Sequence, residues 1–300
     1  MRHLILAICL LPITGALSVQ QDPAQNTPSE QVLQSDESQP PDITGYCSNL
    51  ASASEGSPAL ATVCAFALSQ PAKLPDIICE RVTRRSWQTK ASEVDLDDIN
   101  HSDVIAAQVT YRDGQEYEDN VRVDGKPSDA ASRWSSGAWS NGEFASSLST
   151  IFAPSSRPEF RFHREERLHS IRAIVFDFRV SAGNNKLYCL RSADKAWFPE
   201  FSGKLWLDKT DFRLLRLERE TSHMPGKPIT RVRSTTDYSL VPLGDGTKMV
   251  LPTHADVLVC GSYAVESCDR NIVTFSHWQK FRAKTKIIPN PNNRSFPNCQ

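Results

Sequence analysis

The stretch FSGKLWLDKTDFRLLRLERE, residues 201–220, decides the fold. Residues 201–208 alternate between apolar and polar side chains, and residues 212–220 do so again after the short polar break 209–211. Alternation with period two is typical of a strand with one buried face, and a short polar break between two such runs predicts a β-hairpin. The segment therefore predicts antiparallel sheet.

The same pattern recurs on both sides of the hairpin. Further strand-like runs occupy residues 77–88, 104–112, 115–123, 158–168, 170–180, 186–191, 229–241, 249–260 and 271–283. Turn signals such as Asp113-Gly114 and Gly244-Asp245-Gly246 separate many of them. About ten strands with short connections indicate a mainly β protein with one large antiparallel sheet, and adjacent hairpins argue against a βαβ repeat.

Two segments have helical rather than strand periodicity. The Ala-rich residues 57–68 suit a short helix ended by Gln70-Pro71. In SNGEFASSLSTIFAP, residues 140–154, Ser140 and Glu143 have capping-box spacing and Pro154 prevents continuation. The apolar face of this second helix consists of Phe144, Leu148, Ile151 and Phe152. Such a face needs a partner surface, and the concave side of a curved sheet provides one.

The first 18 residues, MRHLILAICLLPITGALS, have the features of a secretory signal peptide. A basic start at Arg2 precedes an apolar run from Leu4 to Ile13, and Ala16 and Ser18 supply small residues before the expected cleavage point. The run is too short to span a bilayer. We expect an exported protein, periplasmic or secreted after cleavage.

Residues 19–44 are rich in Gln, Ser, Pro and acidic residues, and we expect a disordered leader there. Residues 45–300 then form a single β-rich domain. No later apolar run reaches membrane-spanning length, so the sequence does not predict an integral membrane protein. The formal net charge of −1 favours neither nucleic acid nor an anionic membrane as a partner, and we expect a monomer.

Of the eight cysteines, all but Cys9 remain after cleavage, and in an exported chain they are disulfide candidates. Cys260 and Cys268 flank a short loop and form the best pair, and Cys47 with Cys64 is a second pair by proximity in sequence. Seven is an odd number, so one thiol is free or pairs outside the chain. The absence of a Cys-x-x-Cys motif argues against a metal site, and nothing in the sequence calls for a cofactor.

The sequence contains no recognisable catalytic motif, neither Gly-x-Ser-x-Gly nor His-Glu-x-x-His. The paired carboxylates Glu165-Glu166 and Glu218/Glu220 alternate with arginines, which favours cross-strand ion pairs over glycoside hydrolysis. We therefore expect a protein that is not an enzyme, with a hydrolase of unknown class as the minor alternative. Trp134 and Trp139 precede the second helix, as lid residues over a cavity or as loop anchors.

With these segments in view, the chain resembles an uncharacterised family of secreted bacterial proteins. The likeness lies in residues 74–87, 142–154 and 201–220, and in the strands 251–259 and 271–283. The C-terminal part also resembles the outer-membrane lipoprotein-carrier (LolA/LolB-like) superfamily. The residues that match the carrier motif are Gly203, Leu205, Leu207, Asp208, Leu214, Leu217, Leu251 and Pro252.

The resemblance implies a half-barrel, an incomplete antiparallel barrel whose concave side is covered by helices and holds an apolar ligand. The residues that we expect to line the hollow are Leu205, Leu207, Leu214, Trp134, Trp139, Phe144 and Leu148. Which face of the hairpin points inward stays open, because a slip of one residue exchanges the two faces. The chain departs from the carrier pattern in its cysteines, its N-terminal extension and its arginine-rich strands.

Two functions follow from this reading. The first is an exported, non-enzymatic envelope protein that binds a lipid, a lipoprotein acyl chain or another apolar molecule in the hollow. The alternative is a structural or interaction module whose hollow is filled by its own helices and side chains. The room left inside the half-barrel distinguishes them.

Overall fold

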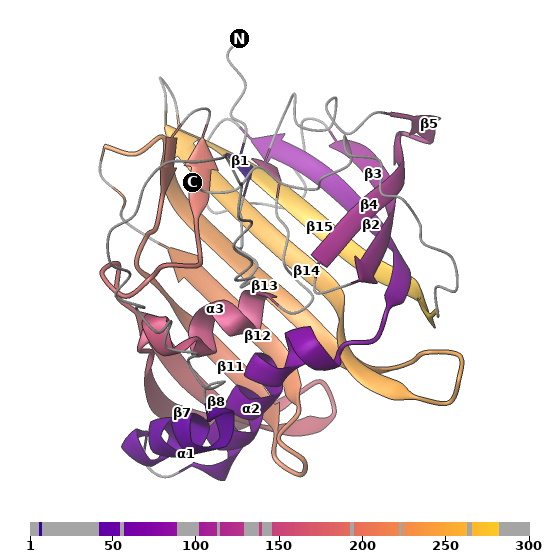
Figure 1. The fold of residues 1–300 in the computed structure, drawn as a ribbon. Coiled ribbons are helices and arrows are strands. Elements are labelled where there is room, and N and C mark those ends of the chain that lie inside the picture. The colour runs from indigo at the N-terminus through magenta and orange to yellow at the C-terminus, as the bar shows by residue number, and fades with distance from the viewer. Residues whose placement is uncertain are drawn as a thin grey trace, which may run out of the picture.

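The computed structural model describes residues 6–7, 42–54, 57–88, 102–112, 115–128, 138–139, 146–192, 195–221, 224, 226–262 and 266–281. Most of the described strands belong to one curved antiparallel sheet of eleven strands, which does not close into a barrel (Figure 1). Its strand order is β5-β4-β3-β2-β15-β14-β13-β12-β11-β8-β7, so the two edges are β5 and β7. The predicted fold, a mainly β half-barrel with helices over its concave side, is confirmed.

The strands of the large sheet fall close to the predicted runs. They are β2 (Ile77–Gln88), β3 (Ser102–Arg112), β4 (Gln115–Val123), β5 (Lys126–Pro127), β7 (Glu159–Leu168), β8 (Ile171–Val180), β11 (Phe201–Asp208), β12 (Leu214–Thr221), β13 (Ile229–Pro242), β14 (Lys248–Ser262) and β15 (Glu266–Lys280). The hairpin of residues 201–220 is β11 and β12, with Leu205 opposite Leu217. The register shifts between Trp206, opposite Arg216, and Leu207, opposite Leu214, so β12 carries one extra residue there while β11 keeps its alternation.

A second, four-stranded sheet was not predicted. Its order is β10-β9-β1-β6, formed by Lys195–Trp197, Leu190–Ser192, Leu6–Ala7 and Ala138–Trp139. The strand predicted at residues 186–191 is wrong over most of its length, because regular pairing with β10 begins only at Leu190. The side chain of the buried Asn185 takes over the local backbone bonding: it accepts from the N–H of Tyr188 at 2.8 Å and donates to its carbonyl at 2.6 Å.

Three α-helices lie over the concave face in the lower part of Figure 1: α1 (Ile43–Ala53), α2 (Pro58–Lys73) and α3 (Ser146–Phe152). The helix α1 was missed, although Asp42 caps it by accepting from the N–H of Gly45 at 3.0 Å. It also begins at Ile43, inside the predicted leader. None of the described helices is long and apolar enough to span a membrane.

The predicted end of α2 at Gln70-Pro71 is wrong, because the helix continues through Pro71 to Lys73. Pro71 lies in the last turn, where the lack of a proline N–H removes only a single intrahelical hydrogen bond. In α3, Leu148, Ile151 and Phe152 are buried as predicted. The predicted cap residues Ser140 and Glu143 lie outside the described residues.

Candidate ligand-binding site

An apolar row crosses four strands on the concave face of the large sheet. Leu205 lies opposite Leu217 of β12 and Phe176 of β8, and Phe176 lies opposite Phe162 of the edge strand β7. Directly opposite residues of an antiparallel pair share a face. Leu205 is fully buried, whereas Phe162 is 43% exposed. The row therefore runs from the covered middle of the sheet to an open edge.

Four of the residues predicted to line the hollow lie in one apolar cluster. Leu205 and Leu207 are 0% exposed, Leu214 is 1% exposed and Leu148 of α3 is 2% exposed. Trp206 instead packs in a separate cluster with Val175 and Leu215 of the neighbouring strands, on the convex face. The structure thus settles the inward face of the hairpin as that of Leu205 and Leu207.

The other residues predicted to line the hollow lie wholly or partly outside the part of the chain that the structure describes. Trp134 and Phe144 are outside the described residues. Trp139 is described only as part of β6, where it pairs with Ala7 of β1. A ligand-lining role for these residues stays a prediction.

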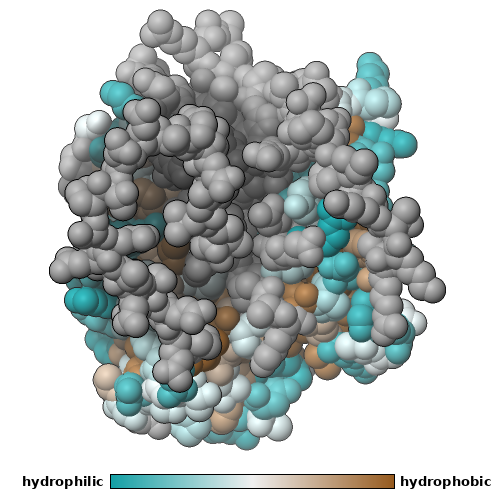
Figure 2. Space-filling view, in the orientation of Figure 1, coloured by the Kyte–Doolittle hydropathy of each residue, from teal (hydrophilic) through white to brown (hydrophobic). Residues whose placement is uncertain are grey.

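The helical cover is held to the sheet by apolar contacts. Leu60 and Val63 of α2 and Ile151 and Phe152 of α3 belong to the same cluster as the inward leucines. The ring of Phe152 stacks on that of Phe160 of β7, with 5.3 Å between centroids. Figure 2 shows this side of the molecule, with hydrophobic residues toward the middle and hydrophilic ones along the rim.

Both predicted disulfides are present. Cys47–Cys64 joins α1 to α2, and Cys260–Cys268 joins directly opposite positions of β14 and β15. Cys189 is also disulfide-bonded. Cys79 is a free thiol, and burial raises its pKa well above the usual range. A buried thiol with a raised pKa is unreactive, so Cys79 packs as a small apolar residue.

A band of polar residues crosses the concave face next to the apolar row. In successive pairs, Arg219 of β12 faces Ser234 of β13, then Val257 of β14, Asn271 of β15 and Arg85 of β2. All five side chains are buried. The arginine-rich strands noted in the sequence therefore place part of their charge inside the half-barrel, so the hollow is not uniformly apolar.

Two of the buried arginines have carboxylate partners. Arg81 lies 2.6 Å from Glu118 of β4, and both side chains are almost completely buried. Arg85 forms a two-pronged contact with Asp103 of β3, through Nε at 2.7 Å and through Nη2. Pairing of this kind offsets the cost of taking charges out of water.

The short strand β6 is fixed to the sheet by two side chains of β15. Asn271 donates from Nδ2 to the carbonyl of Ala138 at 2.9 Å, and the carboxylate of Asp269 accepts from the N–H of Ala138. Burial raises the pKa of Asp269 to about 6, although the nearby Arg85 lowers it. The carboxyl group of Asp269 therefore holds its proton more tightly than an exposed carboxyl group does.

We expect Asp269 to reduce stability as the pH rises from about 4 to about 6. The folded state holds its proton more tightly than the unfolded state, where the pKa is near 3.8, so the penalty is absent at low pH. Above pH 6 the penalty approaches about 3 kcal/mol, the free energy that corresponds to this difference in pKa. Asp269→Asn should therefore unfold at higher urea than the wild type at pH 7 and at the same urea at pH 4.

Asp256→Asn is the matched control, since Asp256 lies on the neighbouring strand β14 and pairs with Arg270, one of whose contacts is 2.9 Å long. It should not gain stability at pH 7. Equal stability of Asp269→Asn and wild type at pH 7 would show that Arg85 already compensates the buried carboxylate.

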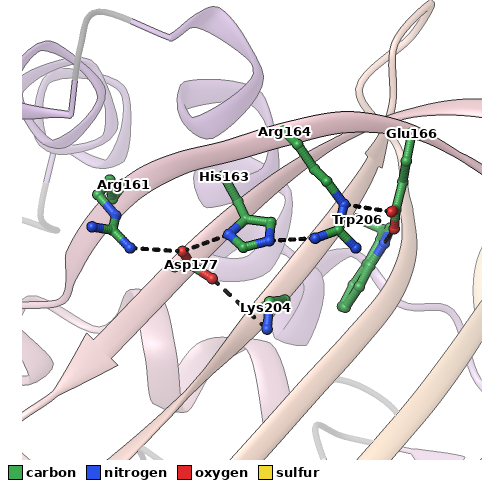
Figure 3. A network of polar contacts seen from close by, with 7 residues as sticks. All are labelled: Arg161, His163, Arg164, Glu166, Asp177, Lys204 and Trp206. Atoms are coloured by element: carbon green, nitrogen blue, oxygen red, sulfur yellow. Dashed lines mark hydrogen bonds and ion pairs between the residues drawn. The ribbon is translucent and has the colours of Figure 1, made fainter.

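The convex face carries a network of charged side chains across β7, β8 and β11 (Figure 3). His163 lies between Asp177, 2.9 Å from its Nδ1, and Arg164. Arg164 contacts Glu166 at 2.6 Å, and the indole N–H of Trp206 donates to the same carboxylate at 2.5 Å. Most of these side chains are exposed or half-buried, so each pair contributes little to stability.

Two of the carboxylates considered for catalysis, Glu165 and Glu166, form ion pairs in the structure. Glu165 contacts Lys209 and lies 3.9 Å from Arg172, and these groups hold the pKa of Glu165 below its usual value. Glu166 has a lowered pKa because Trp206 and Arg164 donate to it. The expected cross-strand ion pair is present for Glu165, which lies near Arg172 of β8, whereas the Arg164–Glu166 pair lies within β7.

The described histidines lie apart. His169 lies in the turn after β7, and β7 changes register at His163, so the two do not share the face of an unbroken strand. His254 is 4.0 Å from Asp237, and His277 is 2.9 Å from Glu80. His101 and His223 lie outside the described residues. Within the described ranges, no group of three His, Cys, Asp or Glu residues is placed to hold a metal ion.

Sequence reasoning missed Arg219, Asp269 and Asn271 as inward-facing polar residues. One signal was present: Arg219 has the same alternation phase as Leu217, a residue of the carrier motif. No comparable signal marked Asp269 and Asn271, because β15 alternates without a motif that fixes its faces.

No family model matches the chain, and no curated protein matches it. Among solved structures, a protein domain from Vibrio parahaemolyticus described as an outer membrane lipoprotein-sorting protein is 12% identical, with a TM-score of 0.33. The match covers 77% of this chain and 95% of that one. A DUF1329 family protein from Desulfovibrio piger is 14% identical over 75% of this chain and 94% of that one, with a TM-score of 0.35.

A structure of MucB in complex with MucA(peri) is 11% identical over 72% of this chain and 93% of that one, with a TM-score of 0.17. At these low scores the likenesses do not bear on function.

Proposed function

We propose that the protein is an exported, non-enzymatic envelope protein that binds a lipid, an acyl chain or another apolar molecule between the concave face and its helical cover. One observation carries the proposal. The apolar row that includes Leu205 and Phe176 continues to Phe162, whose ring is 43% exposed at the open edge of the sheet. The exposed ring at the end of this row gives an apolar chain a place to enter.

Three further features support this reading. Among the described strands, the edges β5 and β7 each pair on one side only, so a ligand could approach the concave side there without breaking a ladder of hydrogen bonds. The cover consists of short helices held by apolar side chains. The signal-like residues 1–18 and the two disulfides fit an oxidising compartment outside the cytoplasm.

The second candidate is a scaffold whose hollow is filled by its own side chains. It is favoured by the nearly complete burial of Leu205, Leu207 and Leu214 under α1, α2 and α3. On this reading the helices are permanent core, and the half-barrel presents only its outer surface to partners.

Native mass spectrometry of the protein purified from the cells that make it, with organic extraction of the same sample, separates the two. We expect a reproducible adduct that extraction recovers as an apolar molecule. Incubation of stripped protein with lipid extracts should restore the adduct. A mass equal to that of the bare chain in both experiments would refute ligand binding and favour the filled scaffold.

A further inference from the structure

Arg219 is a buried cation without a carboxylate partner in the part of the chain that the structure describes. The residue is 5% exposed, and its Nε and Nη1 atoms are buried without a hydrogen-bond partner. Its guanidinium lies over the ring of Tyr188, 4.0 Å from the centroid. This cation–π contact holds the guanidinium over the ring and leaves Nε and Nη1 without a hydrogen-bond partner.

The other buried arginines of the concave face have carboxylate partners. Arg81 contacts Glu118, and Arg85 contacts Asp103. A buried guanidinium that lacks such a partner loses its hydration without replacement, and native proteins rarely retain this arrangement unless another group supplies the missing charge. The unpaired N–H groups of Arg219 thus point to a missing anion.

The position of Arg219 relates it to the proposed site. Arg219 follows Leu217, a member of the apolar row, by two residues on the same face of β12. Its neighbours across the strands are Gly203, which has no side chain, and the hydroxyl-bearing Ser234. From β12 to the exposed Phe162 of β7 is three strand spacings, roughly 14 Å, which is the length scale of an acyl chain.

We propose that Arg219 is the counter-charge for the anionic head group, a carboxylate or a phosphate, of an amphiphile whose apolar chain lies along the row that ends at Phe162. The inference rests on the proposed function and names its substrate class. Nε and Nη1 of Arg219 are buried N–H donors without a partner, and each can donate to an oxygen of a carboxylate or phosphate. Tyr188 positions the guanidinium from the opposite side.

Binding of three probes with the same saturated chain tests the proposal: palmitate, hexadecyl phosphate and the uncharged hexadecanol. Affinities are measured by displacement of a fluorescent apolar dye from the purified protein. The wild type should bind at least one anionic probe about 10- to 100-fold more tightly than hexadecanol. Arg219→Gln should lose this preference and keep its affinity for hexadecanol, whereas Arg219→Lys should keep part of the preference.

Arg216→Gln is the matched control, because Arg216 lies on the same strand but pairs with Asp237 at 2.6 Å on the other face. It should behave as the wild type. Equal affinity of the wild type for all three probes would overturn the role of Arg219 and leave apolar binding intact. If none of the probes displaces the dye, both this inference and the proposed function fail. The preferred anion identifies the head group as carboxylate or phosphate.

Discussion

Leu205→Ala is expected to lower the free energy of unfolding by about 4 kcal/mol. The side chain is 0% exposed and lies opposite Phe176 and Leu217, under the helical cover. Truncation removes its apolar contacts and leaves a cavity that strands on both sides prevent from collapsing. Urea unfolding followed by tryptophan fluorescence measures the change.

The control is Leu240→Ala, which removes the same atoms from a residue of β13 that is 46% exposed. Its effect should stay within about 0.5 kcal/mol. A loss of less than about 1 kcal/mol for Leu205→Ala would mean that the cover is loosely packed over the hairpin. That outcome would strengthen ligand binding over the filled scaffold, since a loose cover leaves room for a ligand.

Glu118→Leu is expected to cost about 3–5 kcal/mol, because it removes the carboxylate that Arg81 contacts at 2.6 Å. Both side chains are buried, so the remaining guanidinium keeps its desolvation cost without the attraction that offset it. The same urea unfolding experiment measures the loss.

The double variant Arg81→Met with Glu118→Leu completes the test. Replacing both charges by apolar groups of similar size should restore stability to within about 1 kcal/mol of the wild type. The single variant Arg81→Met is measured as well. If the double variant loses as much free energy of unfolding as Glu118→Leu and Arg81→Met together, the two residues act independently. Their further contacts, rather than the ion pair, then hold this end of the sheet.

Arg81 and Arg219 are expected to affect stability in opposite ways, and the comparison links stability to function. Removal of the Glu118 carboxylate from Arg81 is expected to destabilise the protein, whereas Arg219 has no carboxylate partner to lose within the described residues. A bound anion would therefore stabilise the wild type through Arg219 by mass action. Residues that serve binding are often those that lower the stability of the empty protein.

Much of the fold could be predicted because its signals are local. The alternation of residues 201–208 and 212–220 produced the hairpin, since side chains of a strand point to opposite faces with period two. Cys260 and Cys268 are close in sequence, so their pairing followed from a short loop. The helix α1 was not predicted, because its Asp42 cap lies at the end of a polar segment whose composition suggested disorder.

By itself, the sequence determined a large antiparallel sheet, its main hairpin and an apolar helix that needed cover. Only the tertiary structure decided that Leu205 faces inward and Trp206 outward, because period two defines two faces without saying which is buried. It alone placed Tyr188 over Arg219, residues that no local pattern connects. Burial of a charge is a property of the surroundings, and those surroundings come from distant segments of the chain.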